Sequence, residues 1–162
     1  MYNTIALSRN ARIKEAAIDF CSVAEWKNPT AITLTMKKGQ YFNHIYVALD
    51  EIMCSRNLRF FLNRLNQKLL GNARRKSRIK TVAVLERDRS GRFHYHLAID
   101  RPPFVFADEF YHELCRCWEK TNWNRKLVDE RVSADDGWIG YIMKLRSKAE
   151  YSESIDWHNC HL

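Results

Sequence analysis

The sequence predicts an α+β domain in which a central antiparallel sheet is covered by packed helices. Two segments, residues 31–36 and 81–100, carry alternating or β-branched apolar residues, the pattern of half-buried strands. Two others, residues 43–70 and 107–121, have apolar residues at intervals of three and four, which is typical of amphipathic helices. Because 162 residues suffice for one ordinary domain, we expect a single domain over residues 1–162.

The N-terminal segment, residues 1–28, is predicted to contain a helix, because apolar residues recur at helical spacing over residues 8–25. Residues 31–36 (AITLTM) come next in the chain. Their apolar side chains alternate with Thr33 and Thr35, which predicts a half-buried strand.

The segment of residues 43–70 predicts one long helix, or two helices broken near Ser55. Gly71 is well placed to end this helix, since glycine readily adopts the backbone conformation of a C-terminal cap. An extra strand around residues 40–42 is also compatible with the sequence.

The segment of residues 81–100 (TVAVLERDRSGRFHYHLAID) predicts a β-hairpin whose turn is the polar stretch at residues 88–92. Gly91 supplies a residue that adopts a positive φ in this turn at low cost. Two prolines follow at residues 102–103 and should end the second strand.

The register of this hairpin has a chemical consequence. Pairing across the turn places Glu86 opposite His94, and Val84 then lies opposite His96. Alternation along each strand puts these side chains on one face of the sheet. Two imidazoles and a carboxylate on one face form a mixed nitrogen and oxygen site, which suits Mg²⁺ or Mn²⁺.

Beyond the hairpin, residues 107–121 predict a helix and residues 127–132 predict a short strand. Ser133 is a suitable N-cap for a last helix. On that helix a tyrosine and two lysines follow one another at intervals of three and four, and therefore share one side: Tyr141, Lys144 and Lys148. A core or surface position is the alternative interpretation of this tyrosine.

A basic stretch at residues 56–80 contains nine Lys or Arg and no Asp or Glu, in a chain whose formal charge is +8. A long stretch of one sign is typical of a surface that binds a nucleic-acid backbone, because neutralised phosphates release counterions. A solvated face is the alternative interpretation for any single residue. We expect DNA contacts from Arg74, Arg75, Lys76 and Arg78.

Three motifs together resemble those of the HUH endonucleases, the group that includes the nicking domains of rolling-circle replication initiators. The step His94-Tyr95-His96, with Glu86 eight residues upstream, resembles the metal motif of that group. Residues 31–35 resemble the first Rep motif, and residues 138–144 (WIGYIMK) resemble the nucleophile motif Tyr-x-x-Lys. The motifs occur in the family's order, and the resemblance implies the HUH endonuclease or ferredoxin-like form of the predicted fold.

The resemblance also implies a role for each matching residue. Glu86, His94 and His96 would bind a divalent metal, Mn²⁺ or Mg²⁺. Tyr141 would attack a phosphodiester of single-stranded DNA, assisted by Lys144, and form a 5′-phosphotyrosyl link. No second tyrosine follows four residues later, so a single-tyrosine enzyme is expected. Further DNA contacts are expected from Thr33, Thr35 and Lys148.

Two other functions remain open at this point. A single-tyrosine HUH transposase or relaxase would share the two histidines and Tyr141. A non-catalytic nucleic-acid-binding protein would use the basic stretch alone and treat the histidines as structural residues. The expected partners are single-stranded DNA or an origin hairpin, with a host helicase and polymerase, and the domain is expected to be a monomer.

The sequence lacks the features of a P-loop nucleotide-binding protein, of a membrane protein and of a disulfide-rich secreted protein. The chain has no G-x-x-x-x-G-K-[ST] phosphate loop and no apolar run of the length that crosses a membrane, so no membrane association is expected. Its five scattered cysteines fit reduced thiols in an intracellular protein, cytoplasmic if bacterial or phage and nuclear if from a eukaryotic virus. Residues 149–162 are expected to form a loose tail.

Overall fold

The structure is a computed structural model of the 162-residue chain that describes residues 11–12, 15–16, 18–21, 25–131 and 154–162. The side chains of residues 73–74 and 126–131 are outside this description. Residues 11–12, 15–16 and 18–21 are helical, in agreement with the predicted N-terminal helix. The predicted helix that begins at Ser133 lies outside the described residues. No helix in the described part is long and apolar enough to cross a membrane.

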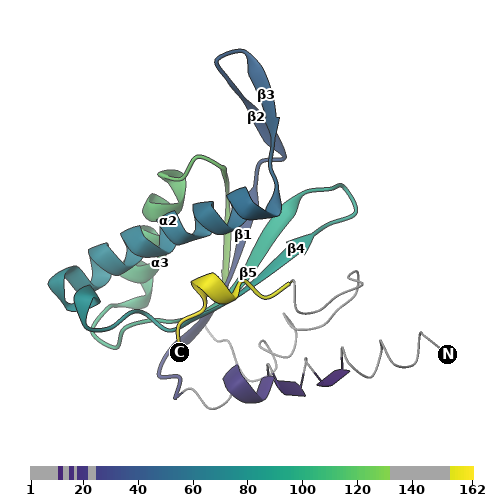
Figure 1. The fold of residues 1–162 in the computed structure, drawn as a ribbon. Coiled ribbons are helices and arrows are strands. Elements are labelled where there is room, and N and C mark those ends of the chain that lie inside the picture. The colour runs from purple at the N-terminus through teal and green to yellow at the C-terminus, as the bar shows by residue number, and fades with distance from the viewer. Residues whose placement is uncertain (1–10, 13–14, 17, 22–24, 132–153) are drawn as a thin grey trace.

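A four-stranded antiparallel sheet forms the centre of the domain, as the sequence predicts (Figure 1). The strands lie in the order β4-β5-β1-β6, and every neighbouring pair is antiparallel. Their bounds are β1 (Pro29–Met36), β4 (Thr81–Arg87), β5 (Phe93–Asp100) and β6 (Asn124–Arg131). The strand predicted at residues 127–132 is therefore confirmed, but it begins three residues earlier.

Helices α2 (Glu51–Leu70) and α3 (Ala107–Glu119) pack on one face of this sheet (Figure 1). The alternating apolar residues of β1 and β5 point to this face and are fully buried there with residues of both helices. On the opposite face, Val82 and Val84 of β4 form a smaller apolar cluster with Cys21 and Ile155. Among the residues that the structure describes, one face of the sheet is therefore thickly covered and the other is only partly covered.

The helix predicted over residues 43–70 begins only at Glu51, and this part of the prediction is wrong. Residues 39–48 instead form a separate hairpin of β2 (Gly39–Phe42) and β3 (Ile45–Ala48). Positive φ values at Asn43 and His44 make the turn between them. The apolar residues at positions 45, 47 and 49 alternate, so they fit a strand as well as a helix. The extra strand around residues 40–42 is confirmed as β2.

Helix α2 ends at the predicted C-cap, Gly71, and has no break at Ser55. The carboxylate of Asp50 accepts a hydrogen bond of 2.7 Å from the backbone N–H of Met53 and caps the first turn. Gly71 ends the helix with a φ of 54°, and its N–H donates to the carbonyl of Gln67. The short 3-10 helix η1 (Gly71–Arg75) follows directly.

The β4 and β5 hairpin has the register that the sequence predicts. Glu86 pairs with His94 and Val84 pairs with His96, and Gly91 in the turn has a φ of 81°. The backbone N–H of Asp88 donates to the carbonyl of Arg92, which closes the turn at the predicted position.

The expectation of a loose C-terminal tail is wrong for residues 154–162, which include the 3-10 helix η2 (Trp157–Asn159). These residues lie along β4 and exchange backbone hydrogen bonds with Thr81, Ala83 and Leu85. The carboxylate of Asp156 accepts a hydrogen bond of 2.7 Å from the hydroxyl of Tyr95. The segment is fixed because the outer edge of β4 offers unpaired backbone groups and because its own polar side chains find partners in the core.

Candidate active site

Two carboxylate and imidazole pairs lie on the partly covered face of the sheet. The Nε2 atom of His96 lies 2.7 Å from Oε2 of Glu86, and Nε2 of His94 lies 3.0 Å from Oδ2 of Asp88. Both imidazole side chains are about one-fifth exposed, so a small ligand in solution can reach them. Glu86 is the backbone partner of His94, yet its side chain contacts the other histidine.

The opposite nitrogen of each imidazole contacts a threonine of β1. The Oγ1 atoms of Thr33 and Thr35 lie 3.2 Å from the Nδ1 atoms of His96 and His94 respectively. These contacts follow from the strand register, which pairs the same residues. Each ring is therefore held between a hydroxyl and a carboxylate, with Nε2 directed toward the carboxylate. Thr33 and Thr35, which we expected to contact DNA, have a supporting contact to the histidines in this structure.

The chemistry of these donors fits a divalent cation. Two imidazole nitrogens and two carboxylates are suitable ligands for Mn²⁺ or Mg²⁺. A second partner on the other ring nitrogen is the usual way in which a metal-binding histidine is oriented. In the described part of the chain, however, no three His, Cys, Asp or Glu side chains meet as one metal cluster. The four residues are arranged as two pairs, and the assignment of Glu86, His94 and His96 as a metal site stays a prediction.

Asp88 is a member of this site that the sequence analysis missed, because its place in the polar turn was a sufficient explanation for it. It lies two residues after Glu86, a spacing that keeps two side chains on one face of a strand. Its carboxylate accepts hydrogen bonds from the hydroxyl of Ser90 and from the backbone N–H of Arg92. The Nε2 atom of His94 also lies within hydrogen-bond distance of it. These hydrogen bonds, that of Ser90 first, hold the pKa of Asp88 below its usual range, so this carboxyl is ionised at neutral pH.

The remaining predicted site residues are not brought together by the described structure. Tyr141, Lys144 and Lys148 lie outside the described residues, as does the side chain of Arg74. Arg75, Lys76 and Arg78 are exposed, and their role in DNA binding stays a prediction.

Arg75 and Arg78 line a polar hollow of about 540 Å³ together with Asn63, Asn66 and Gln67. This hollow lies where the chain enters β4, whereas Glu86 lies at the other end of that strand. The seven residues of β4 span about 20 Å. This hollow and the histidines are therefore separated by about the length of β4.

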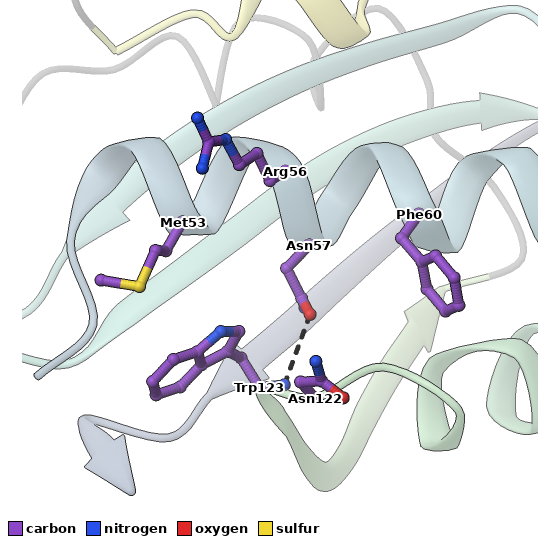
Figure 2. A pocket seen from close by; sticks show the side chains of 6 residues that line it. All are labelled: Met53, Arg56, Asn57, Phe60, Asn122 and Trp123. Carbon is purple, nitrogen blue, oxygen red and sulfur yellow. Dashed lines mark hydrogen bonds between the residues drawn. The ribbon is translucent and has the colours of Figure 1, made fainter. Parts of the chain in front are cut away.

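A further hollow lies beside α2, on the thickly covered face of the sheet. It has a volume of about 250 Å³ and is lined by Met53, Arg56, Asn57, Phe60, Asn122 and Trp123 (Figure 2). The side-chain oxygen of Asn57 accepts a hydrogen bond of 3.3 Å from the backbone N–H of Trp123. Because the histidines lie on the other face, this hollow is separate from the candidate active site.

Comparison with known proteins gives one match. A family model described as replication-associated protein ORF2 matches residues 29–150. The matched range begins with β1 and includes both histidines, both carboxylates and Tyr141. The searches of curated proteins and of solved structures gave no match.

Proposed function

The chain belongs to the replication-associated protein ORF2 family, which indicates a role in the initiation of replication, and we propose that it nicks and rejoins single-stranded DNA as a metal-dependent HUH endonuclease. The observation that carries this proposal is the arrangement of His94 and His96. Each imidazole lies between a threonine hydroxyl and a carboxylate, and each side chain is about one-fifth exposed to solvent.

Each proposed step assigns a task to a residue of this chain. Glu86, His94 and His96, with Asp88 beside them, would hold Mn²⁺ or Mg²⁺, which when bound supplies Lewis-acid polarisation of the scissile phosphate. Thr33 and Thr35 orient the imidazoles through Nδ1. The partners that we propose are single-stranded DNA or an origin hairpin, with the helicase and polymerase of the host.

In the reaction the phenolic oxygen of Tyr141 forms a bond to phosphorus and the bond from phosphorus to the 3′ oxygen breaks. The phenol loses its proton and the leaving 3′ oxygen gains one, so the products are a 5′-phosphotyrosyl link and a free 3′-OH. Lys144 favours the phenolate, because a nearby positive charge lowers the pKa of a phenol. The covalent link conserves the bond energy, so the 3′-OH can later reverse the step without ATP.

The second candidate is a non-catalytic nucleic-acid-binding protein. It is favoured by one observation, namely that the described carboxylates and imidazoles form two separate pairs and not a single three-ligand cluster. In such a protein both pairs would only tie β4 to β5.

One experiment separates the two candidates. The protein is incubated with a mixed pool of single-stranded oligonucleotides and Mn²⁺, and the products are separated in SDS. The nickase forms an SDS-stable protein–DNA adduct that is absent when EDTA replaces Mn²⁺. Sequencing the attached DNA then identifies the recognised site. Absence of an adduct with every sequence, including the cognate origin, would favour the non-catalytic protein.

The threonine contacts lead to a prediction about metal affinity. We expect that Thr33→Val or Thr35→Val weakens Mn²⁺ binding by about 10 to 100-fold, because the imidazole loses its second hydrogen-bond partner. Isothermal titration with Mn²⁺ measures this effect without DNA. Thr30→Val is the matched control in the same strand, since the Thr30 hydroxyl donates to the carbonyl of Asn28 at 3.4 Å and has no hydrogen bond to a histidine among the described residues. Equal affinities of all three variants would remove the threonines from the site.

A further inference from the structure

The hairpin of β2 and β3 projects from the body of the domain (Figure 1). It exposes large side chains, with Tyr41 73% exposed, Ile45 69%, Tyr46 54% and Phe42 43%. An isolated two-stranded hairpin is only marginally stable in water, and clustered exposed apolar side chains mark interaction sites. The exposed face of this hairpin is therefore a candidate binding site.

The two faces of this hairpin differ in their contacts. Phe42 packs edge-on against Trp123 with ring centroids 5.8 Å apart, and Val47 packs against the main core. Trp123 is itself held beside α2 through Asn57 (Figure 2). Side chains alternate along a strand, so the cross-strand pair of Tyr41 and Tyr46 lies on the opposite, outer face. The hairpin is thus anchored by one face and presents two tyrosines on the other.

The two tyrosine rings contact each other, and the ring of Tyr46 also contacts the backbone of the hairpin. The two rings meet edge-on, with centroids 5.3 Å apart and planes at 64°. The ring of Tyr46 lies across Gly39, where any side chain would collide with its hydroxyl. A tyrosine side chain has only two χ angles and loses little entropy on binding, so this pair is a good platform for a planar ligand.

Two lysines, Lys37 and Lys38, lie at the base of the hairpin, where β1 leads into β2. The carboxylates of Asp50 and Glu51 follow the other strand of the hairpin. The ammonium groups of these lysines donate to the backbone carbonyls of Asn122 and Ser90 respectively. Within the described part of the chain neither is paired with a carboxylate. Their charges are therefore available to neutralise an anion.

The hairpin also lies beside the candidate active site. Lys38 contacts Ser90, whose hydroxyl donates to the Asp88 carboxylate next to His94. Thr35, which contacts His94, precedes Gly39 by four residues, which span at most about 14 Å. A strand that touches the tyrosines can therefore continue to the histidines.

We propose that the outer face of this hairpin, formed by Tyr41 and Tyr46 with Lys37 and Lys38 at its base, binds unpaired bases of single-stranded DNA next to the candidate active site. The inference rests on the proposed function for its ligand. Bases stack on the tyrosine rings, and the lysines neutralise adjoining phosphates. Duplex DNA binds more weakly there, because its bases are already stacked on one another.

The test measures binding by fluorescence anisotropy of a labelled single-stranded oligonucleotide in EDTA, where no nicking occurs. Tyr41→Ala should raise Kd at least about 5-fold, and the double variant Tyr41→Ala/Tyr46→Ala should raise it further. Tyr41→Phe retains the ring and should retain binding. Lys37→Gln should reduce the salt dependence of log Kd by about one unit, which the tyrosine variants leave unchanged.

Two matched controls replace exposed aromatic residues elsewhere. Phe104 is 69% exposed beyond the other end of β5, and Phe60 is 47% exposed on α2 in the separate hollow. Phe104→Ala and Phe60→Ala should bind the oligonucleotide with the Kd of the wild type. A wild-type Kd for the double tyrosine variant would overturn the proposal. It would also be overturned if the wild type bound duplex DNA with the same Kd as single-stranded DNA.

The same variants separate this inference from the nickase proposal. If sedimentation shows that the wild type is a dimer and the double tyrosine variant is a monomer with unchanged DNA affinity, the hairpin binds a second copy and the proposal fails. Anisotropy is measured without metal, so it reports binding alone. If the wild type binds the oligonucleotide but forms no adduct in Mn²⁺, the nickase proposal alone is refuted. Normal adduct formation by the double tyrosine variant at low DNA concentration refutes the hairpin site alone.

Discussion

Tyr141→Phe should abolish the covalent protein–DNA adduct while it leaves DNA binding unchanged. Phenylalanine keeps the ring but lacks the oxygen that forms the bond to phosphorus. Removal of an attacking nucleophile typically costs a factor of about 10⁴ or more, so the adduct should fall below detection. The measurement combines an SDS gel with labelled single-stranded DNA in Mn²⁺ and an anisotropy titration of the same oligonucleotide. The expected result is a complete loss in the first and an unchanged Kd in the second.

Tyr111→Phe is the matched control for this experiment. Tyr111 lies on α3, is 41% exposed, and has no lysine three residues later. Its variant should form the adduct at the wild-type rate. An undiminished adduct in Tyr141→Phe would remove Tyr141 as the nucleophile, and peptide mapping of the attached DNA would then identify the residue that replaces it.

His94→Ala and His96→Ala should each reduce Mn²⁺-dependent nicking by at least about 100-fold. A metal that polarises a phosphate contributes several kcal/mol to transition-state stabilisation, and each tenfold loss in rate corresponds to about 1.36 kcal/mol. Each substitution also leaves a carboxylate, Asp88 or Glu86, without its imidazole partner. Initial rates of nicking over a range of Mn²⁺ concentrations measure the loss and show whether excess metal restores activity.

His112→Ala is the control, because His112 is an exposed residue of α3. It should nick at the wild-type rate with the wild-type dependence on Mn²⁺. Unimpaired nicking by either His94→Ala or His96→Ala in Mn²⁺ would refute the metal assignment. If these histidine variants also form the covalent adduct, Tyr141 remains the proposed nucleophile. The two predictions therefore fail independently.

The local sequence pattern was sufficient to predict elements that pack against the element next to them in the chain. The β4 and β5 hairpin is the best example, since its turn and alternation fix the pairing of Glu86 with His94. The pattern failed at residues 43–50, where a spacing of two was interpreted as part of a helix. It also failed for residues 154–162, because nothing in that segment reveals that β4 offers it a free edge.

The sequence by itself determined the antiparallel sheet, the C-terminal cap of α2 and the face on which both histidines lie, because each depends on periodicity and turn chemistry within a short stretch. Only the tertiary structure decided which carboxylate meets which imidazole, and that Thr33 and Thr35 support them from β1. It also decided that the outer face of the β2 and β3 hairpin stays exposed. The physical reason is distance along the chain. Thr33 is 63 residues from His96 and Tyr95 is 61 from Asp156, so these contacts form only when the whole sheet and core pack together.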